Sequence, residues 1–485
     1  MQYILEIFIF LLFINTVASV VTVFRKPRSI QSVLAWMIAL VFLPGIGFIL
    51  YAFCGRGIDQ ESILKLTPED VHDIELIELK VEQDALDFSG WVIPPLDSNG
   101  QKLVRYLDKT QQSPFTQGNE VELFTDGKKK FDGLIADILN AKETIHIEYY
   151  SIYNDRLGNR VMTALVQMAA KGVKVRLIYD PWGSKGANKR WFKPLITLGG
   201  EVAPFVTSKN ILLKSRLNYH LHRKIVVIDG KISWTGGFNI ADQYIGENSK
   251  FGYWRDSHAR IVGPASFTLQ EIFIRDWNAS CEKQQMIHYQ DHFFQLPEKS
   301  QRGPYSMQIV SDGPDSFEDI LKGAIIRMSS DSERRIWIQT PYLIPDDSMI
   351  TTLLIAARSD IDVRIMIPQM PDHPFIYRAT QYYANYLTRL GVKIYIYNNG
   401  FLHSKTCMVD DNLSSIGSMN QDIRSYSLNF EVQAFIYSEE LNHQFEQIFL
   451  ADMENCTLLT EEMIQNQSRW LRFKQNFSRL LSPIL

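Results

Sequence analysis

Residues 218–239 read NYHLHRKIVVIDGKISWTGGFN, and residues 401–420 read FLHSKTCMVDDNLSSIGSMN. Each segment carries a histidine, a lysine two positions later and an aspartate five positions after that, followed by a glycine and an asparagine at matching distances. The matching pairs are His222 and His403, Lys224 and Lys405, Asp229 and Asp410, Gly236 and Gly417, and Asn239 and Asn420. Two copies at identical internal spacing indicate that the chain contains an internal duplication.

The apolar, β-branched run Ile225–Ile228 predicts a strand, in which residues two apart point to the same face. His222 and Lys224 are therefore expected to project together, and Met408–Val409 allows the same reading of the second segment. An imidazole beside an ammonium suits an anionic substrate. A phosphodiester needs donors for its oxygens, a nucleophile at phosphorus and an acid for the leaving alkoxide. Two such segments facing each other would supply all three.

The two segments resemble the signature of the phospholipase D superfamily, H-x-K-x4-D-x6-G-[GS]-x-N, which occurs twice in one chain, and both copies match it fully. The resemblance implies that one histidine attacks phosphorus to give a covalent phosphohistidine. The other protonates the departing alcohol and then deprotonates the incoming one, with no metal and no cofactor. The implied catalytic residues are His222, Lys224, Asp229, His403, Lys405 and Asp410, and the implied phosphate-binding residues are Asn239, Asn420, Gly237 and Ser418.

The sequence leaves three assignments open. Asp229 and Asp410 also stand in turn sequences, which favours a structural role for them. We expect His222 to be the nucleophile and His403 the acid, but the near-symmetric halves leave the reverse assignment equally consistent with the sequence. Asp256 and Glu431 follow the two motifs, and the resemblance makes them the acceptors that orient the histidines, with a surface acid at a strand edge as the alternative.

The sequence around the motifs repeats an alternation of strands and helices. Thr144–Ser151, a helix through Ala170 and Val173–Asp180 in the first half correspond to Arg335–Thr340 and Asp362–Ile367 in the second. The predicted fold is therefore α/β, with two duplicated phospholipase D-like sandwich halves related by a pseudo-twofold axis. The predicted boundaries are a membrane hairpin at 1–56, a connector at 57–118, the halves at 119–300 and 301–455, and an amphipathic tail at 456–485.

The first 24 residues are almost wholly apolar, and Ser32–Cys54 contains no charge. Each run is long enough to cross a hydrocarbon core of about 30 Å as a helix. A cleaved signal peptide is the alternative for the first run, but the run lacks a basic leading region. We therefore expect a two-helix hairpin in a cell membrane. Basic residues in the connecting loop would place the catalytic halves outside if both runs span, whereas interfacial segments would leave the side undetermined.

The composition bounds the class of protein. The chain has 485 residues, 46% of them hydrophobic and 21% charged, which is enough apolar material for large cores. Its net charge of −4 gives no broad basic surface, so nucleic acid is a disfavoured partner. The four cysteines and ten histidines show no spacing typical of a zinc site or a disulfide framework.

The tail carries an aromatic stripe at helical spacing. Trp470, Phe473, Phe477 and Leu480 fall on one helix face, flanked by Arg469, Arg472, Lys474 and Arg479. A basic rim around such a stripe suits an anionic lipid surface. An ordinary docked helix has the same period, so both interpretations remain open.

Within the superfamily, a membrane hairpin followed by two such halves is similar to the bacterial cardiolipin synthases, as are the stretches 144–150, 171–180, 235–242 and the terminal LSPIL. This resemblance implies transfer of a phosphatidyl group from one phosphatidylglycerol to the hydroxyl of another, at an anionic membrane, with glycerol released. The alternatives are a membrane-bound hydrolase that releases phosphatidic acid, a membrane-anchored nuclease, and an inactive lipid-binding scaffold, which two intact motifs disfavour. The oligomeric state is not readable from the sequence.

Overall fold

The computed structural model describes residues 68–87, 96–111, 113–205, 219–316 and 318–482, together with positions 3, 6, 9, 10, 12, 13, 17, 36–38 and 40. The predicted membrane hairpin therefore lies almost wholly outside the described residues. In the described part of the chain, no helix combines the length and the apolar character that a membrane crossing needs.

The first half alternates strands and helices as predicted. Before the motif come β1 (Thr116–Asp126), α6 (Gly127–Asn140), β2 (Thr144–Tyr149), α7 (Arg156–Ala170), β3 (Lys174–Tyr179), α8 (Lys189–Thr197) and β4 (Glu201–Pro204). The motif and the segments after it form β5 (His220–Leu221), β6 (Lys224–Ile228), β7 (Ile232–Gly236), η2 (Asp242–Ile245), β8 (Trp254–Val262) and α9 (Ala265–Ser280). Three single-turn helices follow, η3 (Lys283–Gln285), η4 (Asp291–Phe293) and η5 (Lys299–Gln301). The strand expected at Ile225–Ile228 is confirmed.

The second half repeats this pattern. It begins with β9 (Tyr305–Asp312), α10 (Ile320–Ser330), β10 (Arg335–Gln339), β11 (Leu343–Ile344), α11 (Asp347–Arg358), β12 (Asp362–Pro368), α12 (Pro374–Thr388) and β13 (Lys393–Tyr397). It continues with β14 (Phe401–Leu402), β15 (Thr406–Val409), β16 (Leu413–Gly417), β17 (Gln421–Asp422), α13 (Ile423–Ser427), β18 (Asn429–Tyr437) and α14 (Glu439–Met453). The chain then forms β19 (Cys456–Leu458), α15 (Glu461–Gln465) and α16 (Arg469–Leu480).

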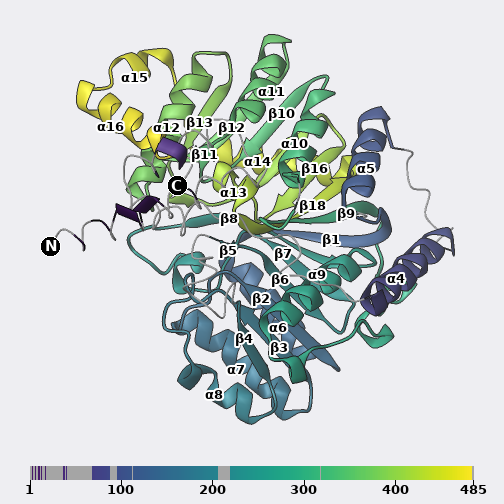
Figure 1. The fold of residues 1–485 in the computed structure, drawn as a ribbon. Coiled ribbons are helices and arrows are strands. Elements are labelled where there is room, and N and C mark those ends of the chain that lie inside the picture. Colours follow the sequence, from purple (N-terminus) through teal and green to yellow (C-terminus); the bar gives the residue numbers. More distant parts are fainter. Residues whose placement is uncertain are drawn as a thin grey trace.

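The strand order shows the duplication directly. The first half pairs in the order β4-β3-β2-β6-β7-β8-β1, and β1 pairs antiparallel with β9. The second half then runs β9-β18-β16-β15-β10-β12-β13, which is the same order from the other side, with β19 added at the edge. Figure 1 shows the first half below and the second half above this junction. The β1–β9 pairing is therefore the pseudo-twofold centre of the molecule.

Each sheet is buried on both faces. Val226 and Ile228 of β6 pack into a core with α6 and α7, whereas Ile225 and Val227 pack into a core with α9. The side chains of a strand alternate between faces, so one β-branched run serves two cores. The second core includes strands and helices of both halves, among them β9, β18 and α14. This shared core joins the halves around the motif strands.

In its described residues, the segment before the catalytic halves forms the helices α4 (Pro68–Asp87) and α5 (Ser98–Gln111). Leu103 and Leu107 of α5 are buried in the core of the second half, and the Asn99 side chain donates to the Met328 carbonyl at 2.9 Å. The predicted connector thus reaches past the first half and packs on the second. Figure 1 shows α5 beside α10.

Candidate active site

Backbone pairing between the halves positions both motif histidines. β5 pairs with β18, and the His222 N–H donates to the Phe430 carbonyl at 2.9 Å. Likewise β14 pairs with β8, and the His403 N–H donates to the Arg255 carbonyl at 2.7 Å. Each histidine is thus held by a strand of the other half.

The same strand pairing between the halves places a carboxylate of the opposite half beside each histidine. Nδ1 of His222 lies 2.8 and 2.9 Å from the two carboxylate oxygens of Glu431, and Nδ1 of His403 lies 2.6 Å from Asp256 Oδ2. Both carboxylates are fully buried. A carboxylate on Nδ1 fixes the proton there and leaves Nε2 available to a substrate. The structure thus brings together the residues that the sequence singled out, but it takes each acceptor from the opposite half, which the sequence did not indicate.

The two carboxylates differ in what else binds them. Glu431 also accepts a hydrogen bond from the Ser418 hydroxyl and one from Asn429 Nδ2 at 3.2 Å. Asp256 accepts a hydrogen bond from its neighbour, the Ser257 N–H, at 2.8 Å. The negative charge of Glu431 is therefore shared among more donors than that of Asp256, in the described part of the chain.

Gly237 and Ser418 occupy equivalent positions behind these carboxylates. A Cβ at Gly237 would lie 1.9 Å from Asp256 Oδ1, so the first half has no room for a serine there. The backbone N–H groups of Gly237 and Ser418 donate to the carbonyls of Ser257 at 2.8 Å and Val432 at 2.9 Å. Both backbone donors are thus already used, the Ser418 hydroxyl donates to Glu431, and Gly237 leaves room for Asp256. The phosphate-binding role expected for Gly237 and Ser418 stays a prediction.

The motif lysines are buried beside the histidines. Lys224 Nζ donates to the His222 carbonyl at 2.5 Å, and Lys405 Nζ donates to the His403 carbonyl. Burial lowers the pKa of Lys224 to about 7 although Glu431 favours its charge. Burial also lowers the pKa of Lys405 to about 8, with Asp256 opposing. An arriving phosphate anion would favour the charged form of both ammonium groups.

The histidines are neutral near pH 7. Burial lowers the pKa of His222 to about 4, against the attraction of Glu431. Burial and the neighbouring Lys405 charge lower the pKa of His403 to about 4, and Asp256 opposes them. A negative charge placed between the two rings would raise both pKa values, because it stabilises the imidazolium form.

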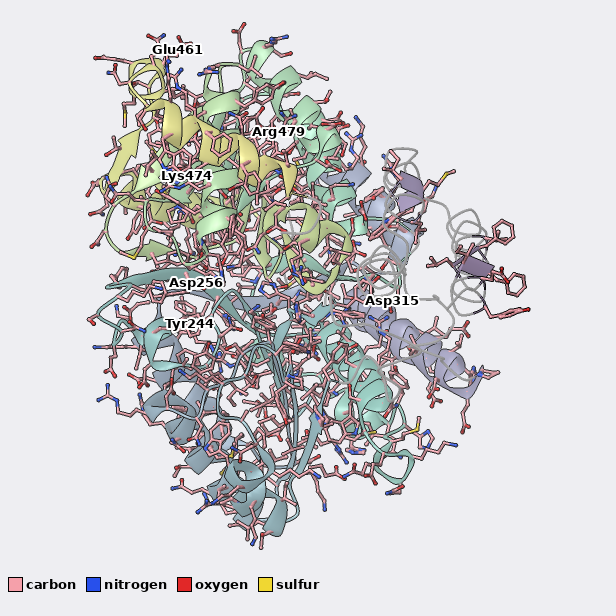
Figure 2. All side chains as sticks on the ribbon, turned by 60° about the vertical axis from the view of Figure 1, so that its left-hand side comes forward. Tyr244, Asp256, Asp315, Glu461, Lys474 and Arg479 are labelled. Atoms are coloured by element: carbon pink, nitrogen blue, oxygen red, sulfur yellow. The ribbon has the colours of Figure 1, made fainter. Side chains whose placement is uncertain are left out.

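A cavity of about 620 Å³ opens over both histidines. Asn239 and Asn420 line it, and the Oδ1 atoms of both amides find no hydrogen-bond partner among the described residues. The Asn239 amide nitrogen donates to the Tyr244 hydroxyl at 3.0 Å. Figure 2 shows Tyr244 and Asp256 near the boundary between the halves. The volume is in the range of pockets that hold small organic ligands.

The cavity wall contains residues that sequence reasoning missed. Tyr150 packs edge-on against His222 with ring centroids 5.1 Å apart, and Trp254 packs against His403 at 5.2 Å. Arg424, on α13, is the single lysine or arginine that lines the cavity among the described residues, and Asp372 and Asp422 lie on the same wall. Arg424 comes four residues after the motif residue Asn420, and this closeness to the motif is the sequence signal for its place at the site.

Asp229 and Asp410 are not among the residues that line this cavity, so their catalytic role stays a prediction beside the turn role that the sequence also allows. Asp229 accepts hydrogen bonds from the N–H groups of residues 142, 143 and 144 at 2.8, 2.8 and 2.9 Å. Asp410 does the same with residues 333, 334 and 335 at 3.0, 2.8 and 3.1 Å. Both have a positive φ, 52° and 50°, which aspartate tolerates better than most residues. They fix the turn after each motif strand.

An arginine braces the backbone of each orienting carboxylate. Arg223 Nε donates to the Glu431 carbonyl at 3.1 Å, and its Nη1 pairs with Asp276 on α9. Arg255 donates to the Asp256 carbonyl and pairs with Asp452 on α14, Nη2 to Oδ2, at 2.7 Å. All are buried.

The two arginine–aspartate pairs, Arg223–Asp276 and Arg255–Asp452, differ in the side chain that lies beside the aspartate. In the second half, Gln339 Nε2 donates to Asp452 at 2.8 Å. The equivalent residue in the first half is Glu148, whose carboxyl interacts electrostatically with Asp276. Both oxygens of Glu148 and Oδ1 of Asp276 have no donor among the described residues. Burial first, and the adjacent Asp276 second, raise the pKa of Glu148 well above its usual value. A protonated Glu148 would donate to Asp276 as Gln339 donates to Asp452.

Comparisons with known proteins agree with this geometry. The family described as "Cardiolipin synthase, PLD-like domain" matches residues 134–277 and 325–453, and the family described as "Phospholipase_D-nuclease N-terminal" matches residues 13–56. A cardiolipin synthase of Listeria monocytogenes serotype 4a (strain HCC23) is 44% identical, covering 98% of each chain. A cardiolipin synthase of Staphylococcus aureus (strain Mu50) is 41% identical, covering 99% of this chain and 97% of its own.

Among solved structures, the phosphatidylserine synthase of Haemophilus influenzae Rd KW20 matches with a TM-score of 0.59 at 14% identity. The match covers 79% of this chain and 100% of that one. At this level of identity the likeness concerns the fold, and it agrees with a duplicated α/β architecture.

Proposed function

Since the chain belongs to the cardiolipin synthase family of the phospholipase D superfamily, a family of phosphatidyltransferases, we propose that its substrates are two phosphatidylglycerol molecules. One gives up its phosphatidyl group and the other receives it on its terminal hydroxyl, so the products are cardiolipin and glycerol. The observation that carries this proposal is the pair of histidines at one cavity, each with Nδ1 on a buried carboxylate.

The first step forms a bond from His222 Nε2 to phosphorus and breaks the bond from phosphorus to the glycerol oxygen. His403, protonated as the anionic phosphodiester enters, gives its proton to that oxygen. The ammonium groups of Lys224 and Lys405 and the amides of Asn239 and Asn420 stabilise the charge on the phosphoryl oxygens. Glycerol leaves, and the phosphatidyl group stays on His222.

The second step reverses the roles. The neutral His403 takes the proton from the terminal hydroxyl of the second phosphatidylglycerol, and the resulting oxygen nucleophile attacks phosphorus. The bond from phosphorus to His222 breaks, and cardiolipin is released. His403 holds this proton until cardiolipin leaves and then releases it to solvent, since its pKa in the empty site is about 4, and the next anionic donor restores the proton as it enters.

The unequal carboxylates support His222 as the nucleophile. A nucleophile must be neutral, whereas the acid must carry a proton. The Glu431 charge is drawn toward the Ser418 hydroxyl and the Asn429 amide, so it stabilises an imidazolium at His222 less. Asp256 lies 2.6 Å from His403 and has fewer competing donors in the described part of the chain, so it stabilises the imidazolium there more.

A second lipid brings a second phosphate, one glycerol unit away from the reacting oxygen. Asp372 and Asp422 on the wall would repel it. We assign Arg424 to this phosphate because its guanidinium can bind two phosphate oxygens at once. The aromatic wall of Tyr150 and Trp254 reduces access of water to the phosphohistidine, which favours transfer over hydrolysis.

The match of residues 13–56 to an N-terminal family supports the further proposal that residues 1–56 anchor the chain in the bacterial membrane. A membrane anchor would keep the cavity close to a substrate that does not leave the bilayer.

Lipid product analysis tests the proposal. The purified chain is incubated with phosphatidylglycerol alone, with a chelator present. Cardiolipin and glycerol in equal amounts are expected. Phosphatidic acid in their place would mean that water reaches the intermediate and that the protein is a hydrolase. No turnover with phosphatidylglycerol would refute both readings.

A further inference from the structure

The last helix of the described chain, α16, points its apolar residues outward. Trp470, Phe473, Phe477 and Leu480 are 64%, 57%, 47% and 75% exposed. We call these four residues the α16 apolar face. The side chains that α16 buries are polar, Gln475 and Ser478, each 2% exposed. This orientation is the inverse of a helix docked on a soluble protein, whose apolar stripe faces the core.

The inverted orientation is fixed by specific contacts. α16 packs along α12, and Asn385 of α12 donates to Gln475 at 3.2 Å and to Gln467 at 3.0 Å. The Ser468 side chain caps the helix by accepting from the Leu471 N–H at 3.2 Å. Arg479 lies over the Tyr382 ring of α12, 4.9 Å from its centroid. Polar contacts therefore hold the inner side of the helix, and the apolar face remains outside.

The exposed rings form one continuous patch. The Trp470 and Phe473 centroids are 5.4 Å apart, and those of Phe473 and Phe477 are 6.3 Å apart, with the rings nearly parallel in both pairs. Contiguous exposed apolar surface of this kind marks an interaction site rather than scattered surface residues.

The charge around the patch identifies its partner. α16 has the sequence RWLRFKQNFSRL, with four basic residues and no acidic one. Lys474 lies 5.7 Å from the Trp470 ring centroid, and Figure 2 shows Lys474 and Arg479 on this helix. A basic rim around tryptophan and phenylalanine side chains complements an anionic bilayer surface, where aromatic rings sit among the headgroups.

The α16 apolar face lies on the helix pair that reaches the active-site cavity. α12 begins at Pro374, and its neighbour His373 and its residue Ile376 line the cavity mouth. Phe375 is 52% exposed beside them, and Trp182, which also lines the cavity, is 71% exposed. A surface that received α16 would therefore lie close to the opening through which lipid headgroups enter.

We propose that the α16 apolar face inserts into an anionic lipid surface and holds the mouth of the cavity toward it. The inference goes beyond the reaction and rests on the proposed function only for the identity of the lipid, phosphatidylglycerol. It also assigns the C-terminal helix a role separate from that of residues 1–56: the latter would keep the chain at the membrane, and α16 would set its orientation there.

Fluorescence quenching in the full-length chain tests the proposal without turnover. The wild type and Trp470→Phe are reconstituted in phosphatidylglycerol vesicles that contain a lipid brominated along its acyl chain. The difference between the two proteins gives the emission of Trp470. We expect the brominated lipid to quench this emission, and more strongly than in phosphatidylcholine vesicles or in high salt, because salt screens the basic rim.

Two other results would overturn the proposal. Protection of Trp470 from both brominated lipid and aqueous acrylamide would mean that protein covers the face, either residues 1–56 or a second copy of the chain. Quenching by acrylamide but not by brominated lipid would mean that the face stays in water.

A matched pair of variants supplies a second readout. Phe473→Ser/Phe477→Ser removes two exposed rings from the patch, and Ile196→Ser/Leu198→Ser removes two exposed apolar side chains at the end of α8, 47% and 44% exposed. Figure 1 shows α8 at the opposite end of the molecule from α16. We expect the first variant alone to lose turnover on vesicles, by about tenfold relative to its turnover on dispersed short-chain phosphatidylglycerol. Equal losses in the two variants would contradict the assignment.

Discussion

Glu148 is a buried carboxyl whose equivalent in the other half, Gln339, is a neutral amide, so the internal duplication predicts that Glu148 is protonated. Gln339, its counterpart in the second half, donates to Asp452 at 2.8 Å, and a protonated Glu148 would donate to Asp276 in the same way. Glu148→Gln should therefore preserve the packing and the brace on Glu431 while removing the need for a proton.

The expected effect depends on pH, and its sign follows from the pKa of Glu148. Burial and Asp276 raise this pKa in the folded state above the value of about 4.3 in the unfolded chain. Above pH 4.3 the folded state holds one proton more than the unfolded state, so the unfolding free energy of the wild type falls as pH rises. The slope is about 1.4 kcal/mol per pH unit, for as long as Glu148 keeps its proton. Glu148→Gln lacks this contribution, so its advantage over the wild type should grow by that amount per unit from pH 5 upward.

The assay is the melting temperature of each protein in detergent from pH 5 to pH 8, with cardiolipin formation as a check on the site. The reciprocal variant Gln339→Glu places a second carboxyl beside Asp452, so it should acquire the slope that Glu148→Gln loses. Glu148→Ala separates charge from packing. It also lacks the slope, but it leaves a void, so it should be less stable than Glu148→Gln at every pH. Parallel curves for the wild type and Glu148→Gln would refute the reasoning, since they would mean that Glu148 is ionised in the folded protein.

Three further predictions concern the reaction. His222→Ala and His403→Ala should each lose nearly all turnover while keeping the wild-type melting temperature. A phosphatidyl adduct trapped by denaturation at alkaline pH, where the bond from phosphorus to nitrogen survives, should be absent from His222→Ala; an adduct there would make His403 the nucleophile. Arg424→Gln should raise the KM for phosphatidylglycerol as acceptor by about tenfold, which corresponds to the loss of one charged hydrogen bond. The share of phosphatidic acid among the products should rise as well. An unchanged product ratio would count against the proposal that Arg424 binds the phosphate of the second lipid. Inorganic phosphate should bind more tightly as pH falls from 8 to 5, because the anion raises the low pKa values of the motif histidines. Calorimetry in two buffers measures the proton uptake on binding. Binding without proton uptake would contradict the assignment of neutral imidazoles to His222 and His403 near pH 7.

Local patterns predicted the secondary structure well. The run of β-branched residues at Ile225–Ile228 forms β6, and the repeated alternation of strands and helices places Val173–Asp180 at β3 and Asp362–Ile367 at β12. These signals are short in range, since a strand or helix is specified by residues a few positions apart. The same is true of the turn role of Asp229, which its neighbour Gly230 already indicated.

Such local patterns could not predict contacts between residues far apart in the chain. That His222 meets Glu431 and His403 meets Asp256 depends on how two sheets pair, and no local sequence encodes it. The orientation of α16 was equally hidden, because the period of Trp470 and its neighbours is the same whether the stripe faces in or out. The supporting role of Ser418 became visible only once its hydroxyl was placed against Glu431.

Because each histidine pairs with a carboxylate of the other half, the site depends on the order in which the chain is synthesised and folds. Each histidine and its carboxylate stand 209 and 147 residues apart in the chain, so neither pair exists until the second half has left the ribosome. Contacts between such distant residues form late in folding, because a large loop must close first. A nascent chain with only one finished half therefore has no histidine paired with its carboxylate. The two histidine–carboxylate pairs therefore form only once residues of both halves have emerged and folded together.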